Sequence, residues 1–287
     1  MNKQPLVSIT MITYNHELYI EKAINSVLMQ KTSFDLELII GNDQSPDKTD
    51  EVVKKCIENY SGNHIIRYFS YEKNKGIMDN FLFLLKQTRG KYIATCEGDD
   101  YWTDPFKLQK QVDIMEGNPQ YSICFHNALI KYEDQSIEDK LFCTGLKNLQ
   151  VFTIRDIIYS NWFCPSASML FRSDRLPDIP DWASKVYNGD LMVQLLLSAN
   201  GDMVYLDDTM SVYRQNAGNL SSKKKSITFY NDRIISLLRK FNSYSKYKYA
   251  LDINRRIVQL YVKSIKSIIL FLLSKLKQKS NFEPSSD

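Results

Sequence analysis

The chain has 287 residues, of which 44% are hydrophobic and 24% charged, so it can bury a full core and is not globally disordered. Its five cysteines are odd in number and widely spaced, without a C-x-x-C pair. This argues against a disulfide framework or a zinc site and favours a reducing compartment. The N-terminal segment lacks the apolar region and cleavage site of a signal peptide, so we expect a cytoplasmic protein.

The net charge of +4 is unevenly distributed. Residues 222–280 contain eleven Lys and four Arg against two Asp, a net charge of +13, so the rest of the chain carries −9. An acidic body joined to a basic C-terminal arm points to an anionic partner, either nucleic acid or phospholipid headgroups.

Strands and helices alternate along the first hundred residues. Apolar, β-branched runs such as LVSITMIT predict buried strands, and segments of helical periodicity separate them. Such β-α-β units predict a mostly parallel sheet flanked by helices. We place Asn15 as the N-cap of the first helix and Ser45-Pro46 at the start of the second. The expected strands cover residues 6–13, 36–40, 64–70 and 91–96, and the expected helices cover 16–30, 47–60 and 76–88.

The pattern is weaker after residue 100. Asp207-Asp208 is interpreted as a turn between two short strands, and His126 as a hydrogen-bonded core residue. The expected helices cover residues 105–115, 150–160, 190–199 and, with few breaks, 227–279; the expected strands cover 121–130, 167–171, 203–206 and 210–213.

Polar residues follow three of the predicted strands at the point where each ends. Right-handed crossovers bring these ends to one edge of the sheet, where α/β proteins bind ligands. Three carboxylates within four residues, without His or Cys, suit Mg²⁺ or Mn²⁺, which bridge to substrate phosphates. The alternative is a solvated acidic turn. The polar residues that follow the three strands are Tyr14-Asn15, Asn42-Asp43 and Glu97-Gly98-Asp99-Asp100, and the last group supplies the three carboxylates.

Several other nucleotide and acyl-transfer motifs are missing from the sequence. There is no G-x-x-x-x-G-K-[ST], no G-x-G-x-x-G after the first strand and no G-x-S-x-G. These absences argue against P-loop kinases, dinucleotide oxidoreductases and α/β-hydrolases. What remains is a sheet that binds a nucleotide through polar side chains and one metal ion.

Four segments, taken in order, resemble the family-2 glycosyltransferases. They are VSITMITYNHELYIEKAINSVLMQ, LELIIGNDQSPDKT, EKNKG and GKYIATCEGDDYWTDPFKLQKQV. The resemblance is dense over residues 6–117 and looser to about 221. It implies a GT-A fold for residues 1–221, with a basic helical extension at 222–287, and a bacterial enzyme of surface-polysaccharide assembly.

The resemblance also implies a nucleotide site. Asp43 matches the aspartate that accepts a hydrogen bond from the imide N–H of uracil, and Asn42 stands where many members carry a first Asp. The other residues implied to lie near the nucleotide are Thr13, Tyr14 and Asn15 at the end of the first strand, and Asn74 and Gly76 in an N-x-G motif.

Glu97-Gly98-Asp99 fills the D-x-D motif of the family, with Glu for the first Asp. In such enzymes one carboxylate of this loop reaches the ribose and another ligates the metal. We assign these roles to Asp99 and Asp100, without deciding between them, and the implied cofactor is Mn²⁺ or Mg²⁺.

Inverting transfer also needs a general base that takes the proton from the acceptor hydroxyl. In this family the base is an acid at the start of a helix, often within an E-D pair. Asn188-Gly189-Asp190 resembles that position, so Asp190 is the expected catalytic base. The alternative is an ordinary N-cap carboxylate, a role compatible with catalysis.

Two further residues are candidates for contacts to the acceptor or the diphosphate. YRQN at 213–216 resembles a late Y-R-x-H segment, in which Arg214 would neutralise diphosphate charge or form a structural ion pair. Asn216 occupies the His position, so a metal-bound imidazole is not carried over. Trp102 would stack on a sugar face or, alternatively, pack against its apolar neighbours.

The C-terminal arm contains the segment RRIVQLYVKSIKSIILFLLSKLKQK at residues 255–279. Its uninterrupted apolar stretch, 268–273, is far shorter than the roughly 20 residues that span a bilayer. A basic amphipathic helix can lie in the headgroup region of a membrane, and the alternative is packing on the body of the protein. Nucleic acid fits less well, because no recognisable binding motif is present.

The leading hypothesis is a metal-dependent, inverting glycosyltransferase. It would move a sugar from a nucleoside diphosphate, UDP by preference, to a hydroxyl of a glycan or lipid-linked acceptor, in the cytoplasm or at the inner face of the cell membrane. The rivals are a nucleotidyltransferase and a non-catalytic glycan- or membrane-binding protein on the same scaffold. The donor sugar, the acceptor, the linkage and the oligomeric state are left open.

Overall fold

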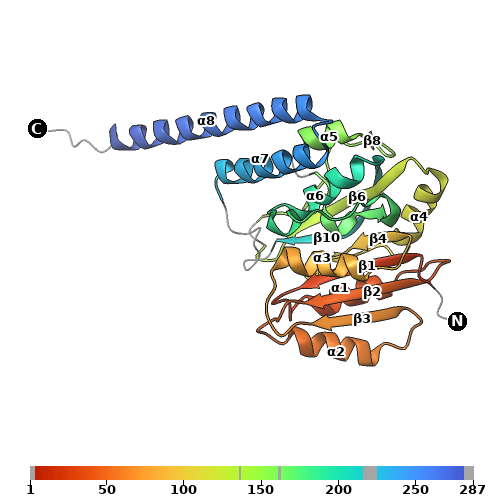
Figure 1. Cartoon of the computed structure of the whole chain (residues 1–287). Helices are drawn as coiled ribbons and strands as arrows, with labels where there is room; N and C mark the ends of the chain where they lie inside the picture. The colour runs from red at the N-terminus through yellow and green to blue at the C-terminus, as the bar shows by residue number, and fades with distance from the viewer. Residues whose placement is uncertain (1–3, 136, 161–162, 216–224, 281–287) are drawn as a thin grey trace, which may run out of the picture. The chain divides into compact units, whose positions relative to one another are not determined.

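The computed structural model describes residues 4–135, 137–160, 163–215 and 225–280 (Figure 1). The chain divides into two compact units. The first unit comprises Met1–Lys185 and Gly189–Ser222, and the second comprises Val186–Asn188 and Lys223–Asp287. The predicted boundary at residues 221 and 222, like the Asn216 position, lies outside the described residues.

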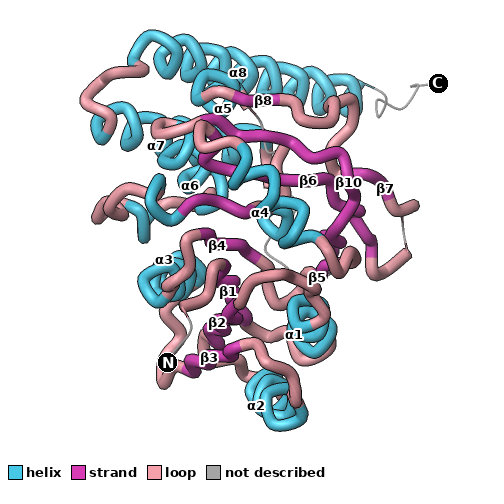
Figure 2. Tube along the Cα trace, turned by 90° about the vertical axis from the view of Figure 1, so that its right-hand side faces the viewer, coloured by secondary structure: helices cyan, strands magenta, loops and turns pink. Residues whose placement is uncertain are grey.

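The first half of the first unit is the predicted β-α-β array. Its four strands pair in parallel in the order β3-β2-β1-β4. Figure 2 shows α1 and α2 on one face of these strands and α3 on the other. The elements are β1 Val7–Thr13, α1 Ile20–Leu28, β2 Leu36–Asn42, α2 Thr49–Asn59, β3 Ile65–Ser70, α3 Ile77–Gln87 and β4 Tyr92–Thr95.

The second half extends the same sheet. Beyond β4 the order continues β9-β6-β10-β5, with β7 on β6 and β8 on β10; β9 runs antiparallel to both neighbours, and β10 runs parallel to β6. The elements are β5 Tyr101–Trp102, α4 Lys107–Gly117, β6 Tyr121–Tyr132, β7 Lys140–Leu141, β8 Val151–Phe152, α5 Ile154–Tyr159, η1 Ser166–Ser168, β9 Leu170–Arg172, η2 Ser173–Arg175, η3 Ala183–Lys185, α6 Gly189–Ser198 and β10 Asp202–Gln215.

The strand register brings the expected site loops together. Thr13 at the end of β1 lies opposite Asn42, and Asn42 lies opposite Ser70 at the end of β3. The loop after β4 returns to β1, because the N–H of Gly98 donates to the carbonyl of Ile12 at 2.9 Å. The carboxyl ends of four parallel strands therefore meet at one edge of the sheet.

The core explains why these runs become strands and helices. Every residue of β2 is buried, and β1 is buried except for one position. The apolar residues of α1 recur on one face and pack on this sheet. His126 is fully buried in β6, with Nδ1 2.7 Å from the carbonyl oxygen of Asn127, which is the core role predicted for it.

Two predicted helix starts are wrong. Asn15 is not an N-cap: its φ is 60°, and α1 begins at Ile20 after Tyr19. Ser45-Pro46 does not open the second helix, which begins at Thr49. The Ser45 hydroxyl instead donates to Oδ1 of Asn42 at 2.6 Å. In both places a cap-type residue holds a loop.

Two predictions in the second half are also wrong. The Asp207-Asp208 pair is not a turn between strands, because β10 runs through it with irregular register to β6 between Leu206 and Ser211. The helix expected over 150–160 is shorter. Residues Val151–Phe152 form β8, and α5 follows with a capping box between Thr153 and Asp156.

The second unit is a pair of helices, α7 Ile227–Tyr244 and α8 Ala250–Ser280. The hydroxyl of Ser226 caps α7 by accepting from the N–H of Phe229. The predicted helical arm breaks between the two helices, where Lys246 and Tyr247 have positive φ. Among the described residues, no helix is both long enough and apolar enough to cross a bilayer.

Candidate functional site

The loops after β1 and β2 are joined by hydrogen bonds. The N–H of Asn15 donates to the hydroxyl of Ser45 at 3.0 Å, and the N–H of His16 donates to that of Thr49 at 2.9 Å. Glu17 and the Asp47–Lys48 segment exchange two further bonds, each of 2.9 Å. The two loops therefore form one rigid support beside the expected nucleobase position, and Tyr14 is half exposed on it.

Asp43, directly after β2, is buried and fixed by backbone. One carboxylate oxygen accepts the N–H of Lys75 at 2.6 Å, and the other accepts the N–H of Gly76 at 2.8 Å. Asn74 reaches back, since its amide donates to the Asp43 carbonyl at 2.9 Å. Gly76 has a φ of 86°, which favours glycine. The structure thus brings three predicted nucleotide residues together.

The loop after β4 holds the acidic cluster. Asp99 and Asp100 are buried, and Glu97 is partly buried beside them. A Cβ at Gly98 would lie 2.7 Å from the Thr13 hydroxyl, so the close approach to β1 requires glycine there. Thr13 is the predicted residue on the other side of this contact.

The carboxylates of this loop crowd one another. Burial and the charge of Asp99, followed by that of Glu97, raise the pKa of Asp100 well above its usual range. One Asp100 oxygen accepts the backbone N–H of Arg214 at 2.9 Å. Within the described part of the chain, its other oxygen is buried without a hydrogen-bond partner. A buried carboxylate oxygen without a donor is costly unless a cation or another donor reaches it.

Asp190 belongs to the same region. Burial raises the pKa of Glu97 to about 8, and the charges of Asp99 and Asp190 add to that shift. Asp190 lies in the first turn of α6 and is partly exposed, with Oδ1 accepting its neighbour's N–H at 2.8 Å. Gly189 precedes it, and a Cβ there would lie 2.5 Å from the sulfur of Met78, which would have to shift. The charge of the predicted base Asp190 therefore acts on a carboxyl group of the acidic loop.

Arg214 connects the end of β10 to the acidic loop. Its guanidinium donates to the carbonyl of Asp99 at 2.9 Å and lies 2.8 Å from a carboxylate oxygen of Glu133. The guanidinium carbon also lies 4.5 Å from the ring centroid of Tyr101 and 5.0 Å from that of Tyr19. The structural ion pair considered for Arg214 is thus present, and it fixes the cationic side chain beside the cluster.

Trp102 does not offer a platform to a sugar. Its ring is 1% exposed, and its indole N–H donates to the carbonyl of Ala167 at 2.8 Å. Lys107 lies 4.0 Å from the ring centroid on the inner side. Trp102 therefore packs in the core, as the alternative interpretation had it, and it pairs with the sheet as part of β5.

A divalent cation fits the donor set of this loop, although the described residues place no group of three His, Cys, Asp or Glu around one point. Asp99 and Asp100 supply hard carboxylate oxygens, and one Asp100 oxygen has no hydrogen-bond partner among the described residues. A small hard cation commonly takes one or two protein carboxylates and completes its shell with phosphate oxygens and water. Two carboxylates are therefore sufficient.

The sequence interpretation gave no separate role to three residues that the structure places beside the site, although it included Glu97 in the D-x-D motif. His16 lies with Nδ1 3.2 Å from the Thr13 hydroxyl and Nε2 3.8 Å from an Asp99 oxygen. Glu133 forms an ion pair with Arg214, and the charges of Asp99 and Asp190 both raise the pKa of Glu97. The signal for His16 and Glu97 was their place in loops after strands, whereas Glu133 had no signal in the sequence.

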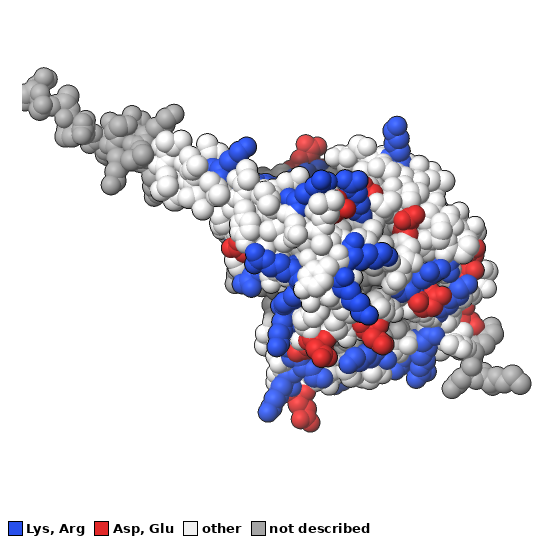
Figure 3. Space-filling model, turned by 45° about the horizontal axis from the view of Figure 1, so that its top comes forward, with Lys and Arg blue, Asp and Glu red and all other residues white. Residues whose placement is uncertain are grey.

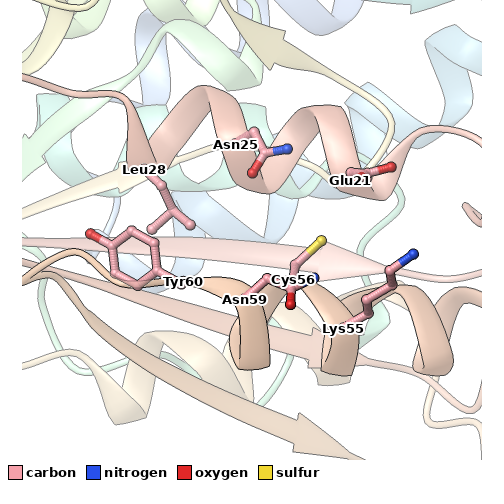
Figure 4. A pocket seen from close by; sticks show the side chains of 7 residues that line it. All are labelled: Glu21, Asn25, Leu28, Lys55, Cys56, Asn59 and Tyr60. Carbon is pink, nitrogen blue, oxygen red and sulfur yellow. The ribbon is translucent and has the colours of Figure 1, made fainter.

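A separate hollow lies between α1 and α2, with a volume of about 190 Å³ (Figure 4). It contains none of the predicted site residues, and burial raises the pKa of its Cys56 thiol, which disfavours a nucleophilic role. Its lining residues are Glu21, Asn25, Leu28, Lys55, Cys56, Asn59 and Tyr60.

Comparison with known proteins assigns the fold and the family. Residues 8–176 match the model of glycosyl transferase family 2. The chain belongs to this family. An uncharacterized protein of Mycobacterium tuberculosis, Rv1520, is 34% identical over 213 residues, which are 74% of this chain and 59% of the relative, so the chain spans less than two thirds of that relative's length.

Two solved structures share the GT-A fold of this family-2 chain. S. aureus TarS in complex with UDP-GlcNAc has a TM-score of 0.62 at 19% identity, covering 83% of this chain and 65% of that one. The mannosyltransferase PcManGT from Pyrobaculum calidifontis, in complex with GDP-Man and Mn²⁺, has a TM-score of 0.60 at 12% identity, covering 99% and 82%. The predicted fold class and family are confirmed.

Proposed function

We propose that this family-2 chain transfers a sugar from a nucleoside diphosphate donor to a hydroxyl group. The observation that carries the proposal is the convergence of acidic residues from two distant segments. The charges of Asp99 and Asp190 both raise the pKa of Glu97, although the loop after β4 and the start of α6 are about ninety residues apart in sequence. This convergence and the family match favour sugar transfer over the rival nucleotidyl transfer and over a binding protein.

Uridine diphosphate is the proposed donor nucleotide. Asp43 and the loop at residues 74–76 form the base side of the site, and a carboxylate there accepts the imide N–H of uracil. The complex of TarS with UDP-GlcNAc is consistent with such a donor. Each Asp43 oxygen has a second lone pair, so the backbone bonds leave acceptor capacity for the base.

The proposed reaction is a single inverting displacement. Asp190 takes the proton of the acceptor hydroxyl, the hydroxyl oxygen bonds to the anomeric carbon, and the bond to the diphosphate oxygen breaks. The nucleoside diphosphate leaves with the electron pair. Arg214 keeps the acidic loop in place by its bond to Asp99 and supplies positive charge nearby.

A divalent cation is part of the proposal. Asp99 and Asp100 would hold Mn²⁺ or Mg²⁺, which would neutralise the charge that develops on the departing diphosphate. PcManGT, which shares the fold of this chain, was solved with Mn²⁺ and GDP-Man, and this supports the proposed cation. The proposed acceptor is a glycan or lipid-linked sugar.

Incubation of the full chain with Mn²⁺ and a panel of UDP- and GDP-sugars tests the proposal. We expect slow release of nucleoside diphosphate from one donor, abolished by Asp190→Asn and unchanged by Asp174→Asn, an exposed acid in η2. Pyrophosphate formed from a nucleoside triphosphate and a sugar phosphate would instead establish a nucleotidyltransferase. Donor binding without turnover, with every acceptor class added, would establish a binding protein.

A further inference from the structure

The long helix α8 has one face that packs within the second unit. Ile253, Ile257, Leu260 and Ser264 are buried on this face. The amide of Asn231 on α7 donates to the carbonyl of Leu260 at 3.1 Å and to the hydroxyl of Ser264 at 2.9 Å. The contact with α7 is therefore fixed by both apolar and polar groups.

The opposite side of α8 carries a second apolar stripe. Val258, Val262, Ile265, Ile269 and Leu272 recur at spacings of three and four, so they lie on one side of the helix. Their exposed fractions run from 46% to 61%. We call these five residues the outer stripe. Few soluble proteins leave so long an apolar row in water without a partner for it.

The apolar surface widens toward the end of α8. Asn231 is only four residues from the start of α7 and already lies beside Ser264, so α8 continues beyond α7 (Figure 1). All six residues of the stretch 268–273 are between 49% and 66% exposed. A coiled-coil partner would cover one stripe, whereas these residues point in all directions around the helix.

Positive charge accompanies this apolar surface. Lys263 and Lys266 flank the outer stripe and, with Val258, Gln259 and Val262, line a shallow groove of about 340 Å³. Residues 253–280 contain seven Lys and Arg and no Asp or Glu. Figure 3 shows the described part of this stretch as mostly white, with blue side chains on it.

We propose that the outer stripe and its flanking lysines dock on an anionic lipid bilayer. The helix lies along the surface, with the stripe among the upper acyl chains and Lys263 and Lys266 at the lipid phosphates. A second copy of α8 is a poorer occupant, because residues 253–280 of two such helices would bring fourteen positive charges together, and Asp252 at the start of each helix is its only carboxylate. A lipid surface supplies the missing anions and also covers more of the apolar side chains of residues 268–273 than one facing helix would.

Vesicle flotation of the full chain tests the proposal without any sugar donor. We expect binding to phosphatidylcholine vesicles that contain about one-third phosphatidylglycerol, and at least about ten-fold weaker binding to phosphatidylcholine alone. Raising the salt concentration should weaken the first and leave the second unchanged. Absence of binding to the anionic vesicles at low salt would overturn the proposal.

A pair of double variants tests the outer stripe. Ile269→Ser/Leu272→Ser should lower the partition coefficient by about ten-fold or more, because two apolar side chains no longer enter the bilayer. The control, Leu141→Ser/Leu149→Ser, changes two leucines of the first unit with similar exposure, 47% and 52%, and should bind as the wild type does. Circular dichroism would verify that all three proteins are equally helical. Equal binding by both variants would contradict the proposal.

The lysines give an independent readout. Lys263→Gln/Lys266→Gln should weaken binding to anionic vesicles by about 30-fold, which corresponds to about 1 kcal/mol for each charge near the surface. Lys86→Gln, an exposed lysine of α3, should leave it unchanged. If light scattering instead shows a dimer that Ile269→Ser/Leu272→Ser dissociates, with no lipid binding by the wild type, the occupant is a second copy and the proposal is wrong.

Discussion

Two carboxylate sites at the same sheet edge are built in opposite ways. Asp43 has both oxygens occupied by backbone N–H groups of the loop at residues 74–76. Asp100 has one oxygen on the Arg214 N–H and the other buried without a hydrogen bond among the described atoms, and its neighbours are acidic. The first site is complete as folded, and the second gains stability only when positive charge arrives. Under the proposed function, the Asp43 site, which we call the complete site, would face the nucleobase, and the Asp100 site, which we call the primed site, would face the diphosphate.

The largest expected effect comes from removing the proposed base, which leaves both carboxylate sites intact. Asp190→Asn should lower turnover by about 10³-fold, within the range of general-base catalysis, while donor affinity changes less than about two-fold. Single-turnover rates and calorimetric binding of UDP would separate the two. A parallel loss of donor affinity would assign Asp190 to the donor site instead.

The primed site can be broken by Asp100→Asn. The amide still accepts the Arg214 N–H and has no charged form for burial and the acidic neighbours to disfavour, so the apo protein should unfold at the same or a higher temperature. Binding of Mn²⁺ in the presence of UDP should fall by about 100-fold, as measured by calorimetry. Asp113→Asn, an exposed acid of α4, is the matched control. Unchanged Mn²⁺ affinity would remove Asp100 from the cation site.

The complete site can be broken by Asp43→Asn. One amide N–H₂ would then face a backbone N–H, so we expect a loss of about 2 kcal/mol in the free energy of unfolding and about ten-fold weaker UDP binding. The two variants thus differ in sign: Asp43→Asn destabilises the apo protein, and Asp100→Asn does not. Equal stability of both variants would refute the contrast on which the comparison rests.

The sequence predicted the sheet edge better than it predicted the loops. Strands at 36–40 and 91–96 and the polar residues after them follow from local pattern, because buried parallel strands are continuous apolar runs. The helix starts predicted from Asn15 and Ser45 were wrong, because a residue that can cap a helix can equally form a hydrogen bond with another loop. Only tertiary contacts decide between the two roles. The ion pair of Glu133 and the burial of Trp102 both depend on contacts with β10. No local sequence pattern indicates these long-range contacts.

The last expected effect concerns stability alone, at Lys107. Burial lowers the pKa of Lys107 to about 7 from an ordinary 10.5, so the folded state binds fewer protons than the unfolded state between these values. The free energy of unfolding should therefore rise with pH across that interval, by about 1 kcal/mol per pH unit, and this contribution is absent below pH 7.

Lys107→Met removes this contribution. Urea denaturation at pH 7 and pH 9 should show a smaller rise for the variant than for the wild type. Lys86→Met, which changes an exposed lysine, should retain the wild-type rise. Identical pH dependence in wild type and Lys107→Met would mean that the ammonium group keeps its ordinary pKa in the core.

The reciprocal bonds between the loops at residues 15–17 and 45–49 have a consequence for protein engineering. Each loop supplies the acceptors for the other's backbone donors, so a graft of either segment alone from a homologue would leave amide groups without acceptors. The two segments therefore have to be exchanged together. We expect the preference for a nucleobase to transfer between homologues only when both are replaced.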